Sequence, residues 1–283
     1  MKYTRKSFLK MSGALALGAV PFLKACAPSA SRQKSYGIQL YTLRDIIGED
    51  PQGTIRTLAE YGYNQIESYE GPAGIFWNMG HKDFNSFLDD IGIRMVSTHA
   101  NVFQNFEQKV EQLAENGVPY ITCPYIGDQG SIDAYKEMAE TFNRLGEIAN
   151  DAGIKFAYHN HAYTFEVLEG QIPQQVLMDE TDPDLVEYQM DIYWVEAAGQ
   201  DSAEWLERYS GRFTSCHMKD LGRTGSGHES VVLGTGTIDF PAIVDVAKDH
   251  GMEYYLVEQE AYTGTSPMQS AESNARYMET LDL

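Results

Sequence analysis

Four short, apolar segments of the chain end in residues that can bind a metal ion or move a proton. They are IKFAYHNHAYTFE (154–166), VEYQMD ending at Asp191, RFTSCH ending at His217 and YYLVE ending at Glu258. Imidazole and carboxylate groups are suitable ligands for manganese, cobalt, magnesium or zinc. Because these segments recur about one β/α unit apart, a closed barrel of parallel strands would gather their ends at one rim. The pattern predicts an enzyme with a bound divalent metal ion.

The first of these segments carries the densest set of reactive groups. His159 and His161 are two positions apart, so both face one side of an extended strand while Asn160 faces the other. If that side is the barrel interior, one imidazole can bind the metal ion and the other can bind substrate or transfer a proton. Glu166 follows on a loop, where it either folds back to the rim as a ligand or base, or stays a solvated acid.

Other strand ends offer groups that suit a polar substrate. Lys219 lies two residues after His217 and therefore faces the same side of its strand. It can stabilise an oxyanion, or it can form a salt bridge at the rim with no chemical role. Aromatic faces such as that of Trp194 can stack on sugars. We expect the substrate-binding groups to be Gln39, Tyr41, Glu67, His99 and Trp194.

The remaining sequence alternates between strand-like and helix-like segments from residue 36 onward. Candidate strands are 36–41, 64–69, 94–99, 120–124, 154–160, 186–191, 212–218 and 253–258, and helix-like stretches include 51–61, 82–91, 105–116, 132–152, 203–209 and 240–250. Five of these helices are followed by a glycine that suits a helix C-cap: Gly62, Gly92, Gly117, Gly153 and Gly251. The alternation predicts an α/β fold, a (β/α)8 TIM barrel. The competing open doubly wound sheet usually has a glycine-rich nucleotide loop after its first strand, which YTLRDIIGED lacks.

The N-terminal residues differ in composition from the rest. Four basic residues precede a moderately apolar stretch, 11–23, and no acidic residue occurs before Asp45, which is the layout of an export signal. The apolar stretch is shorter than the about 20 residues of a membrane-spanning helix. Leu23 to Cys26 resembles a bacterial lipoprotein box, so Cys26 is a candidate for a lipid anchor, with a cleaved signal and no lipid as the alternative. We expect an export signal (1–26), a linker (27–35) and a barrel (36–283), in a periplasmic or membrane-anchored protein.

The charge of the chain limits its partners. The 283 residues include 41 acidic and 21 basic ones, for a formal net charge of -20. Such a surface repels phosphate backbones, so nucleic acid is not an expected partner, and a small neutral carbohydrate is favoured. Cys123 and Cys216 lie in apolar segments, where two buried free thiols are expected, with one disulfide as the alternative. The sequence carries no signal for an oligomeric state.

Six segments of the chain together resemble a known family. YGIQLYTLR, YHNHAYTFE, MDIYWVEAAG, CHMKD, LGTGTIDF and YLVEQE are similar to segments of the xylose isomerase-like TIM barrels, a family of sugar phosphate isomerases and epimerases. The resemblance covers nearly everything from Tyr36 to Leu283. It implies a divalent metal ion held by Asp191, His217 and Glu258. The family commonly has a glutamate where this chain has His159, so the fourth ligand is either His159 or Glu166. The resemblance therefore does not carry over an epimerisation in which two glutamates exchange the proton.

The expected reaction follows from this kind of site. A metal ion bound to a carbonyl and its neighbouring hydroxyl stabilises an enediolate, so a base can remove the adjacent proton. Returning that proton elsewhere gives isomerisation or epimerisation, and expelling a β substituent gives a lyase. Sugar isomerisation or epimerisation is the main expectation, with catalytic groups at His161, Glu166, Lys219 and Glu258.

Three alternatives accompany this expectation. Exported proteins of this superfamily that eliminate the aglycone from 3-keto sugars make a 3-keto-glycoside lyase the first alternative. A lipoprotein that binds carbohydrate without turning it over is the second, and a chelator would leave its ligand affinity nearly intact. The third is an endonuclease of the same superfamily, which would need a basic groove that the acidic composition disfavours.

Overall fold

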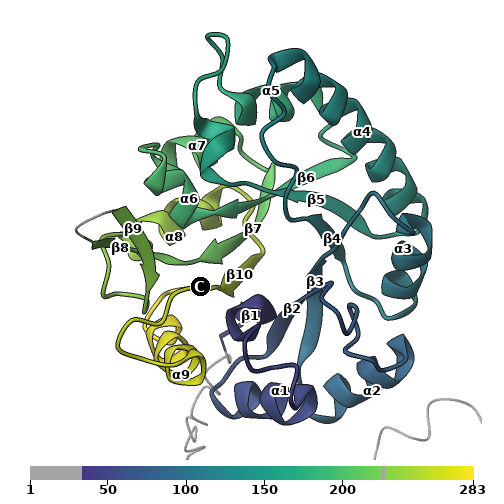
Figure 1. The fold of residues 1–283 in the computed structure, drawn as a ribbon, viewed down its shortest axis with the longest axis vertical. Helices are drawn as coiled ribbons and strands as arrows, with labels where there is room; N and C mark the ends of the chain where they lie inside the picture. The colour runs from purple at the N-terminus through teal and green to yellow at the C-terminus, as the bar shows by residue number, and fades with distance from the viewer. Residues whose placement is uncertain (1–33, 225–226) are drawn as a thin grey trace, which may run out of the picture. The chain divides into compact units, whose positions relative to one another are not determined.

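The eight barrel strands run parallel and close into a ring. The computed structural model describes residues 34–224 and 227–283, so the predicted export signal, and all of the predicted linker except Lys34 and Ser35, lie outside the described residues. The ring order is β1-β10-β7-β6-β5-β4-β3-β2 (Figure 1). The strands are β1 Gly37–Gln39, β2 Gln65–Tyr69, β3 Arg94–His99, β4 Tyr120–Cys123, β5 Lys155–His159, β6 Val186–Asp191, β7 Phe213–Met218 and β10 Tyr254–Val257. The predicted TIM barrel is confirmed.

Helices separate the strands along the chain, and α1 to α5 follow one another around the outside of the barrel (Figure 1). The helices are α1 Pro51–Glu60, α2 His81–Asp90, α3 Phe106–Glu115, α4 Ile132–Asp151, α5 Pro173–Glu180, α6 Ile192–Ala197, α7 Ser202–Arg208, α8 Phe240–Asp249 and α9 Pro267–Met278, with 3-10 turns at Leu40–Leu43 and Ala162–Phe165. All five predicted C-cap glycines have positive φ, from 67° at Gly117 to 106° at Gly62. Glycine is favoured there because it has no Cβ to strain the left-handed conformation.

The strands bury different residue types on their two sides. In β6, Tyr188 points outward, where its ring meets Phe213 and its hydroxyl bonds the Thr181 hydroxyl at 2.9 Å. The next residue, Gln189, points into the barrel and forms hydrogen bonds with side chains from β2, β3 and β5. Alternation of side chains along a strand therefore puts the apolar core between barrel and helices and leaves polar groups at the inner rim.

One antiparallel hairpin interrupts the β/α alternation and was not predicted. It follows β7 and consists of β8 Asp220–Thr224 and β9 Gly227–Val231. The buried carboxylate of Asp220 anchors the segment after it, accepting hydrogen bonds from the backbone N–H groups of Leu221, Gly234, Gly236 and Ile238 at 2.8–3.3 Å. A Cβ at Gly236 would lie 2.3 Å from an oxygen of Asp220, so this close approach requires glycine.

Two further observations concern the described residues. Cys123 and Cys216 are buried and free, as expected for two thiols in apolar strands. None of the helices in residues 34–224 and 227–283 combines the length and apolar character that crossing a membrane requires.

Candidate active site

Asp191, His217 and Glu258 meet at the rim formed by the carboxyl ends of the strands. They end β6, lie near the end of β7 and follow β10, respectively, which are neighbouring strands of the ring. Nδ1 of His217 lies 3.1 Å from Oε2 of Glu258 and 3.9 Å from Oδ2 of Asp191. All three side chains are buried, and one potential ligand atom from each lies within 4.8 Å of the others. The structure therefore brings together three residues that are far apart in the sequence.

One carboxylate oxygen in this group has no hydrogen bond. Oδ1 of Asp191 caps α6 by accepting from the Trp194 N–H at 3.1 Å. Oδ2 of Asp191 is buried and has no hydrogen-bond partner among the described residues. It lies 3.6 Å from Nε2 of His159 and 3.5 Å from Nζ of Lys219. Because a buried anionic oxygen is unfavourable without a hydrogen bond, these nitrogen and oxygen ligands fit a divalent cation at this point.

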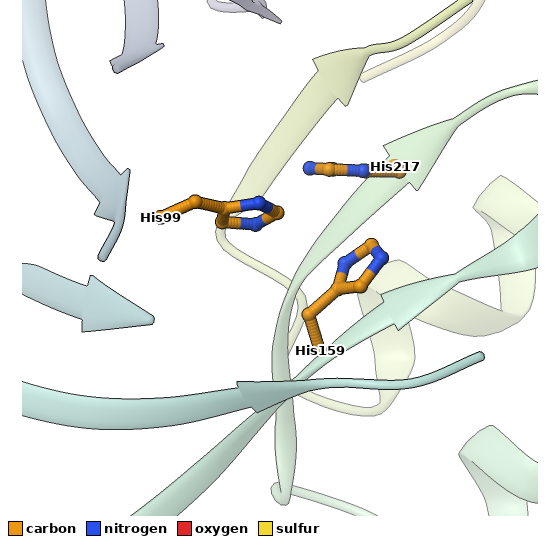
Figure 2. A group of neighbouring side chains, drawn as sticks. All are labelled: His99, His159 and His217. Atoms are coloured by element: carbon orange, nitrogen blue, oxygen red, sulfur yellow. The ribbon is translucent and has the colours of Figure 1, made fainter. Parts of the chain in front are cut away.

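A second group of possible ligands overlaps the first. His99, His159 and His217 come from β3, β5 and β7, and Figure 2 shows their rings turned toward a common centre. Their ring centroids are 4.6–5.3 Å apart, and one nitrogen of each lies within 4.8 Å of the others. His217 belongs to both groups. The rim thus offers both nitrogen and oxygen ligands, a mixture that zinc, manganese and cobalt accept.

Beneath the histidines lies a fully buried polar layer centred on Glu67. Oε1 of Glu67 accepts from Gln39 Nε2 at 2.7 Å and lies 2.7 Å from His217 Nε2, while Oε2 accepts from Gln189 Nε2 at 2.8 Å. Oε1 of Gln189 lies 2.7 Å from His99 Nε2 and 3.0 Å from His159 Nδ1. These bonds orient the rings that face the cavity. Gln39 and Glu67 thus support the histidines from below and do not line the cavity, where the sequence led us to expect them as substrate contacts.

The charges of Glu67 and His217 stabilise each other. Burial alone would raise the pKa of the Glu67 carboxyl, but His99 and His217 beside it lower that pKa to about 2. Burial would likewise lower the pKa of His217, but Glu258 and Glu67 raise it to about 10. At Asp191, burial raises the pKa to about 6 against the opposing charge of Lys219. The site therefore concentrates carboxylates around one imidazole and one ammonium group.

A cavity of about 590 Å³ opens above this cluster. It is lined by Tyr41, His99, His159, His161, Lys219 and Glu258 of the predicted residues, together with Tyr69, Glu70, Ala100, Asn101, Val102, Phe103, Cys123, Pro124, Tyr125 and Glu260. Its volume lies within the about 300–1,000 Å³ range of small-molecule sites. Four predicted residues, Gln39, Glu67, Asp191 and His217, are fully buried and outside the lining, and two further predicted residues are also outside it. Glu166 is exposed and outside the lining, which agrees with the alternative that it is a solvated acid. Trp194 is also outside the lining, with its ring against His161.

His161 is a neutral imidazole at the edge of the cavity. Its ring lies near those of Tyr163 and Trp194, at centroid distances of 5.9 and 5.6 Å. Its Nδ1 is buried and has no hydrogen-bond partner among the described residues. Burial, with the nearby charge of Lys219, lowers the pKa of this imidazole to about 3, so it is neutral near neutral pH. Asn160 does not line the cavity, and its side chain forms hydrogen bonds of 3.1 and 3.2 Å with the Asp191 backbone.

Lys219 is a buried cation surrounded by acids. Its Nζ lies 3.1 Å from Oε2 of Glu258 and 3.5 Å from Oδ2 of Asp191, and it also bonds Glu260. Although burial would lower the pKa of this amine, the neighbouring carboxylates, first Asp191, raise it. The ammonium also lies 5.1 Å from the ring centroids of Tyr193 and Trp194. Lys219 is therefore charged and lines the cavity beside the candidate metal ligands.

Sequence reasoning did not single out Gln189 and Glu260. Each had a signal, because Gln189 is two positions before Asp191 and Glu260 is two positions after Glu258, so each shares the side of its neighbour in an extended segment. The cavity residues Glu70, Asn101, Phe103 and Tyr125 lie on loops after β2, β3 and β4. Such loop positions have no strand periodicity to mark them.

Comparisons with known proteins agree with this fold. A model of the family described as the xylose isomerase-like TIM barrel matches residues 55–281, and the chain belongs to this family. A crystal structure of a sugar phosphate isomerase/epimerase from Parabacteroides distasonis is 29% identical, with a TM-score of 0.77 over 88% of this chain and 94% of that one. The IolI protein, solved with a zinc atom, is 15% identical with a TM-score of 0.69 over 87% of this chain and 97% of that one, which shows the shared fold alone.

Curated relatives are described as inosose dehydratases. The enzyme of Clostridium perfringens strain 13 is 32% identical over 144 residues, or 45% of this chain and 48% of that protein. The enzyme of Clostridium beijerinckii is 28% identical over 201 residues, or 64% of this chain and 61% of that protein. The chain thus spans about half the length of the first of these relatives and somewhat more of the second. The chain is thus similar to part of these two dehydratases.

Proposed function

We propose that this protein is a divalent-metal-dependent enzyme that removes the proton next to a carbonyl group of a small carbohydrate and completes the reaction by β-elimination. The observation that carries the proposal is the buried Oδ2 of Asp191, which has no hydrogen-bond partner among the described residues. It lies next to His217 and Glu258 under a cavity of about 590 Å³. Binding a sugar without turning it over does not require such a group.

Asp191, His217 and Glu258 would hold the ion, and His159 is the better candidate for the fourth ligand. Nε2 of His159 lies 3.6 Å from Oδ2 of Asp191, whereas Glu166 is exposed. The mixture of nitrogen and oxygen donors favours zinc, manganese or cobalt over magnesium. When bound, the ion would supply Lewis acidity that polarises the substrate carbonyl.

The chain itself supplies one base and one acid. His161 is neutral and lines the cavity, so its imidazole can accept the proton next to the carbonyl. Lys219 carries the positive charge and three donor hydrogens, so it can donate a proton to the oxygen that leaves from the β position. Glu258 and Glu260 hold the ammonium in place.

Elimination is favoured over epimerisation because, among the described residues that line the cavity, we assign one base, His161. Epimerisation by proton transfer needs acceptors on both faces of the carbon, and the family glutamate on β5 is replaced here by His159. Glu258 is already engaged by His217 and Lys219. The dehydratase relatives support this choice. Isomerisation is the second candidate, because a structural relative that is 29% identical over most of both chains is described as a sugar phosphate isomerase/epimerase.

The test is solvent exchange. Metal-loaded protein is incubated in deuterated water with a panel of free keto sugars, sugar phosphates and 3-keto-glycosides, and the products are identified by mass spectrometry and NMR. We expect metal-dependent deuterium incorporation, accompanied by loss of water or an aglycone. Exchange with an isomerised product would move the assignment to the second candidate. Unaltered ligands with affinities that survive chelation would overturn the proposal in favour of a binding protein.

Export is a separate proposal that rests on the N-terminal sequence. The basic residues, the apolar stretch and Cys26 support a lipoprotein outside the cytoplasm. Mass spectrometry of the protein purified from its native cells tests it. A mature chain that begins at an acylated Cys26 is the expected result, and an intact Met1 terminus would contradict it.

A further inference from the structure

Exposed aromatic side chains gather at the mouth of the candidate active site. Four large apolar side chains are exposed in the described part of the chain: Tyr41 at 38%, Phe103 at 52%, Tyr125 at 59% and Val167 at 71%. The three aromatic ones all line the cavity, whereas Val167 does not. Exposed apolar groups that concentrate at one cavity indicate a ligand-binding surface.

These rings and the metal-ligand candidates come from different arcs of the barrel. Tyr41, Phe103 and Tyr125 follow β1, β3 and β4. Asp191 and His217 belong to β6 and β7, and Glu258 directly follows β10. In the ring order, β1 to β4 occupy one arc and β5, β6, β7 and β10 the other (Figure 1). A ligand that reached the buried cluster and also covered the aromatic rings would therefore extend from one arc to the other.

Two of the three rings are held by their neighbours. Tyr125 packs edge-on against His161 and Tyr163, each at a centroid distance of 5.4 Å. Tyr41 packs edge-on against Tyr69 at 5.2 Å, and the Arg44 guanidinium lies 4.7 Å from the Tyr41 ring centroid. A ring fixed in this way loses little conformational entropy when a flat ligand stacks on it.

The charges around the cavity disfavour an anionic substrate. Among the described lining residues, Lys219 is the one lysine or arginine, and Asp191, Glu258 and Glu260 already surround its ammonium group. Glu70 adds a further carboxylate to the lining, and Lys109, which bonds Glu70 at 2.6 Å, also donates to the Asn101 carbonyl. Arg44 donates to the carbonyls of Tyr41 and Glu260. A phosphate group would find no unpaired cation among these residues.

We propose that the cavity takes a neutral substrate with two rings: a reacting sugar over the buried polar cluster and a second ring on Tyr41, Phe103 and Tyr125. The second ring presents a flat apolar face, which either an aryl group or another sugar can supply. The inference rests on the proposed function for the position of the reacting sugar. It adds a distinct subsite and excludes sugar phosphates as preferred substrates.

Calorimetric titration of metal-loaded, full-length protein tests the subsite without turnover. The probes are methyl, phenyl and glucosyl glycosides of glucose, galactose and xylose, together with glucose 6-phosphate. For at least one sugar we expect the phenyl or the glucosyl glycoside to bind about tenfold more tightly than the methyl glycoside, equivalent to about 1.4 kcal/mol. The larger of the two gains identifies the second ring as aryl or sugar.

Substitutions locate the gain. Phe103→Ala and Tyr125→Ala should each remove most of the advantage of the two-ring probe while leaving methyl glycoside affinity unchanged. Val167→Ala is the matched control, because it removes an exposed apolar side chain outside the cavity, and it should keep the full advantage.

Two results would overturn the inference: no two-ring probe binds more tightly than its methyl counterpart, or glucose 6-phosphate binds more tightly than the neutral probes. Because the methyl and phenyl glycosides have no carbonyl group and do not react, the outcome is separable from solvent exchange. Exchange without a two-ring advantage removes the subsite alone. A two-ring advantage without exchange removes the proposed reaction alone.

Discussion

Nε2 of His217 lies 2.7 Å from Oε1 of Glu67, although the two residues are 150 positions apart in the chain. Both side chains are buried, so this contact fixes the imidazole ring and leaves Nδ1 directed toward Glu258 and Asp191. A ligand histidine is commonly held in this way through its other nitrogen. Glu67 is therefore a positioning residue of the candidate metal site.

Replacing that carboxylate should weaken metal binding without removing a ligand. We expect Glu67→Gln to lower the affinity for the divalent ion about 10–100-fold, because the ring of His217 loses its charged partner. Competition with a chelator measures the affinity. Glu187→Gln is the control, because this carboxylate lies on the same sheet but pairs with Lys155. Equal affinities in both variants would contradict the positioning role.

Asp191 has two separable roles, and the choice of variant distinguishes them. Asp191→Asn keeps an oxygen that can cap α6, so it should retain the fold while losing metal and turnover. Asp191→Ala should lose metal and also about 1 kcal/mol of unfolding free energy through the missing cap. Metal analysis and urea denaturation of both variants test this. His217→Ala should likewise lose metal and turnover, and full activity in any of the three would end the metal hypothesis.

The assigned base and acid predict different partial reactions. His161→Gln should keep its bound metal but lose solvent deuterium exchange, because the proton acceptor is gone. Lys219→Gln should retain exchange and lose the elimination product, because the leaving oxygen is no longer protonated. NMR of the recovered substrate and product separates the two steps. The assignment is wrong if the two variants lose exchange and product to the same extent.

Asp220 should be important for stability and not for chemistry. Its carboxylate bonds four backbone N–H groups of the segment after β7. We expect Asp220→Ala to reduce the unfolding free energy by about 3 kcal/mol, because buried donors are left unpaired. Asp245→Ala, on the exposed face of α8, should change it by less than about 0.5 kcal/mol. Urea denaturation compares the two, and similar losses would refute this reading of the hairpin.

Buried tyrosines predict loss of stability at alkaline pH. Burial raises the pKa of Tyr188 above its ordinary value, and its hydroxyl bonds Thr181 in the core. In the unfolded chain the phenol ionises near pH about 10. Above that pH the folded state therefore keeps a proton that the unfolded state loses. The free energy of unfolding is unaffected by Tyr188 below the pKa of the unfolded chain and falls as the pH rises above it. Tyr188→Phe should flatten the alkaline part of a denaturation series. An unchanged slope would contradict the assignment.

Much of the fold could be predicted because the signals are local. The eight barrel strands are short apolar segments, and five of the helices before them end at a glycine that takes positive φ. Strand ends meet at one rim in any parallel barrel, so Asp191, His217 and Glu258 could be grouped without coordinates. Alternation along β5 likewise predicted that His159 and His161 share a side, and their ring centroids are 4.9 Å apart.

The features that were missed depend on tertiary contacts. The hairpin β8–β9 has an isolated two-stranded pairing that no periodicity announces, and α9 is rich in small and polar residues. Gln189 bridges Glu67, His99 and His159, a role that exists only once the ring closes. The exposed aromatic residues of the cavity, Tyr41, Phe103 and Tyr125, follow three different strands. Their spacing along the chain has no common pattern.

Anomalous diffraction from crystals of the protein loaded with zinc or manganese tests the central claim most directly. The account predicts one strong anomalous peak per chain that contacts Asp191, His217 and Glu258, and no such peak in Asp191→Asn crystals grown under the same conditions. A peak elsewhere in the molecule, or none at this rim in the unmodified protein, would contradict it.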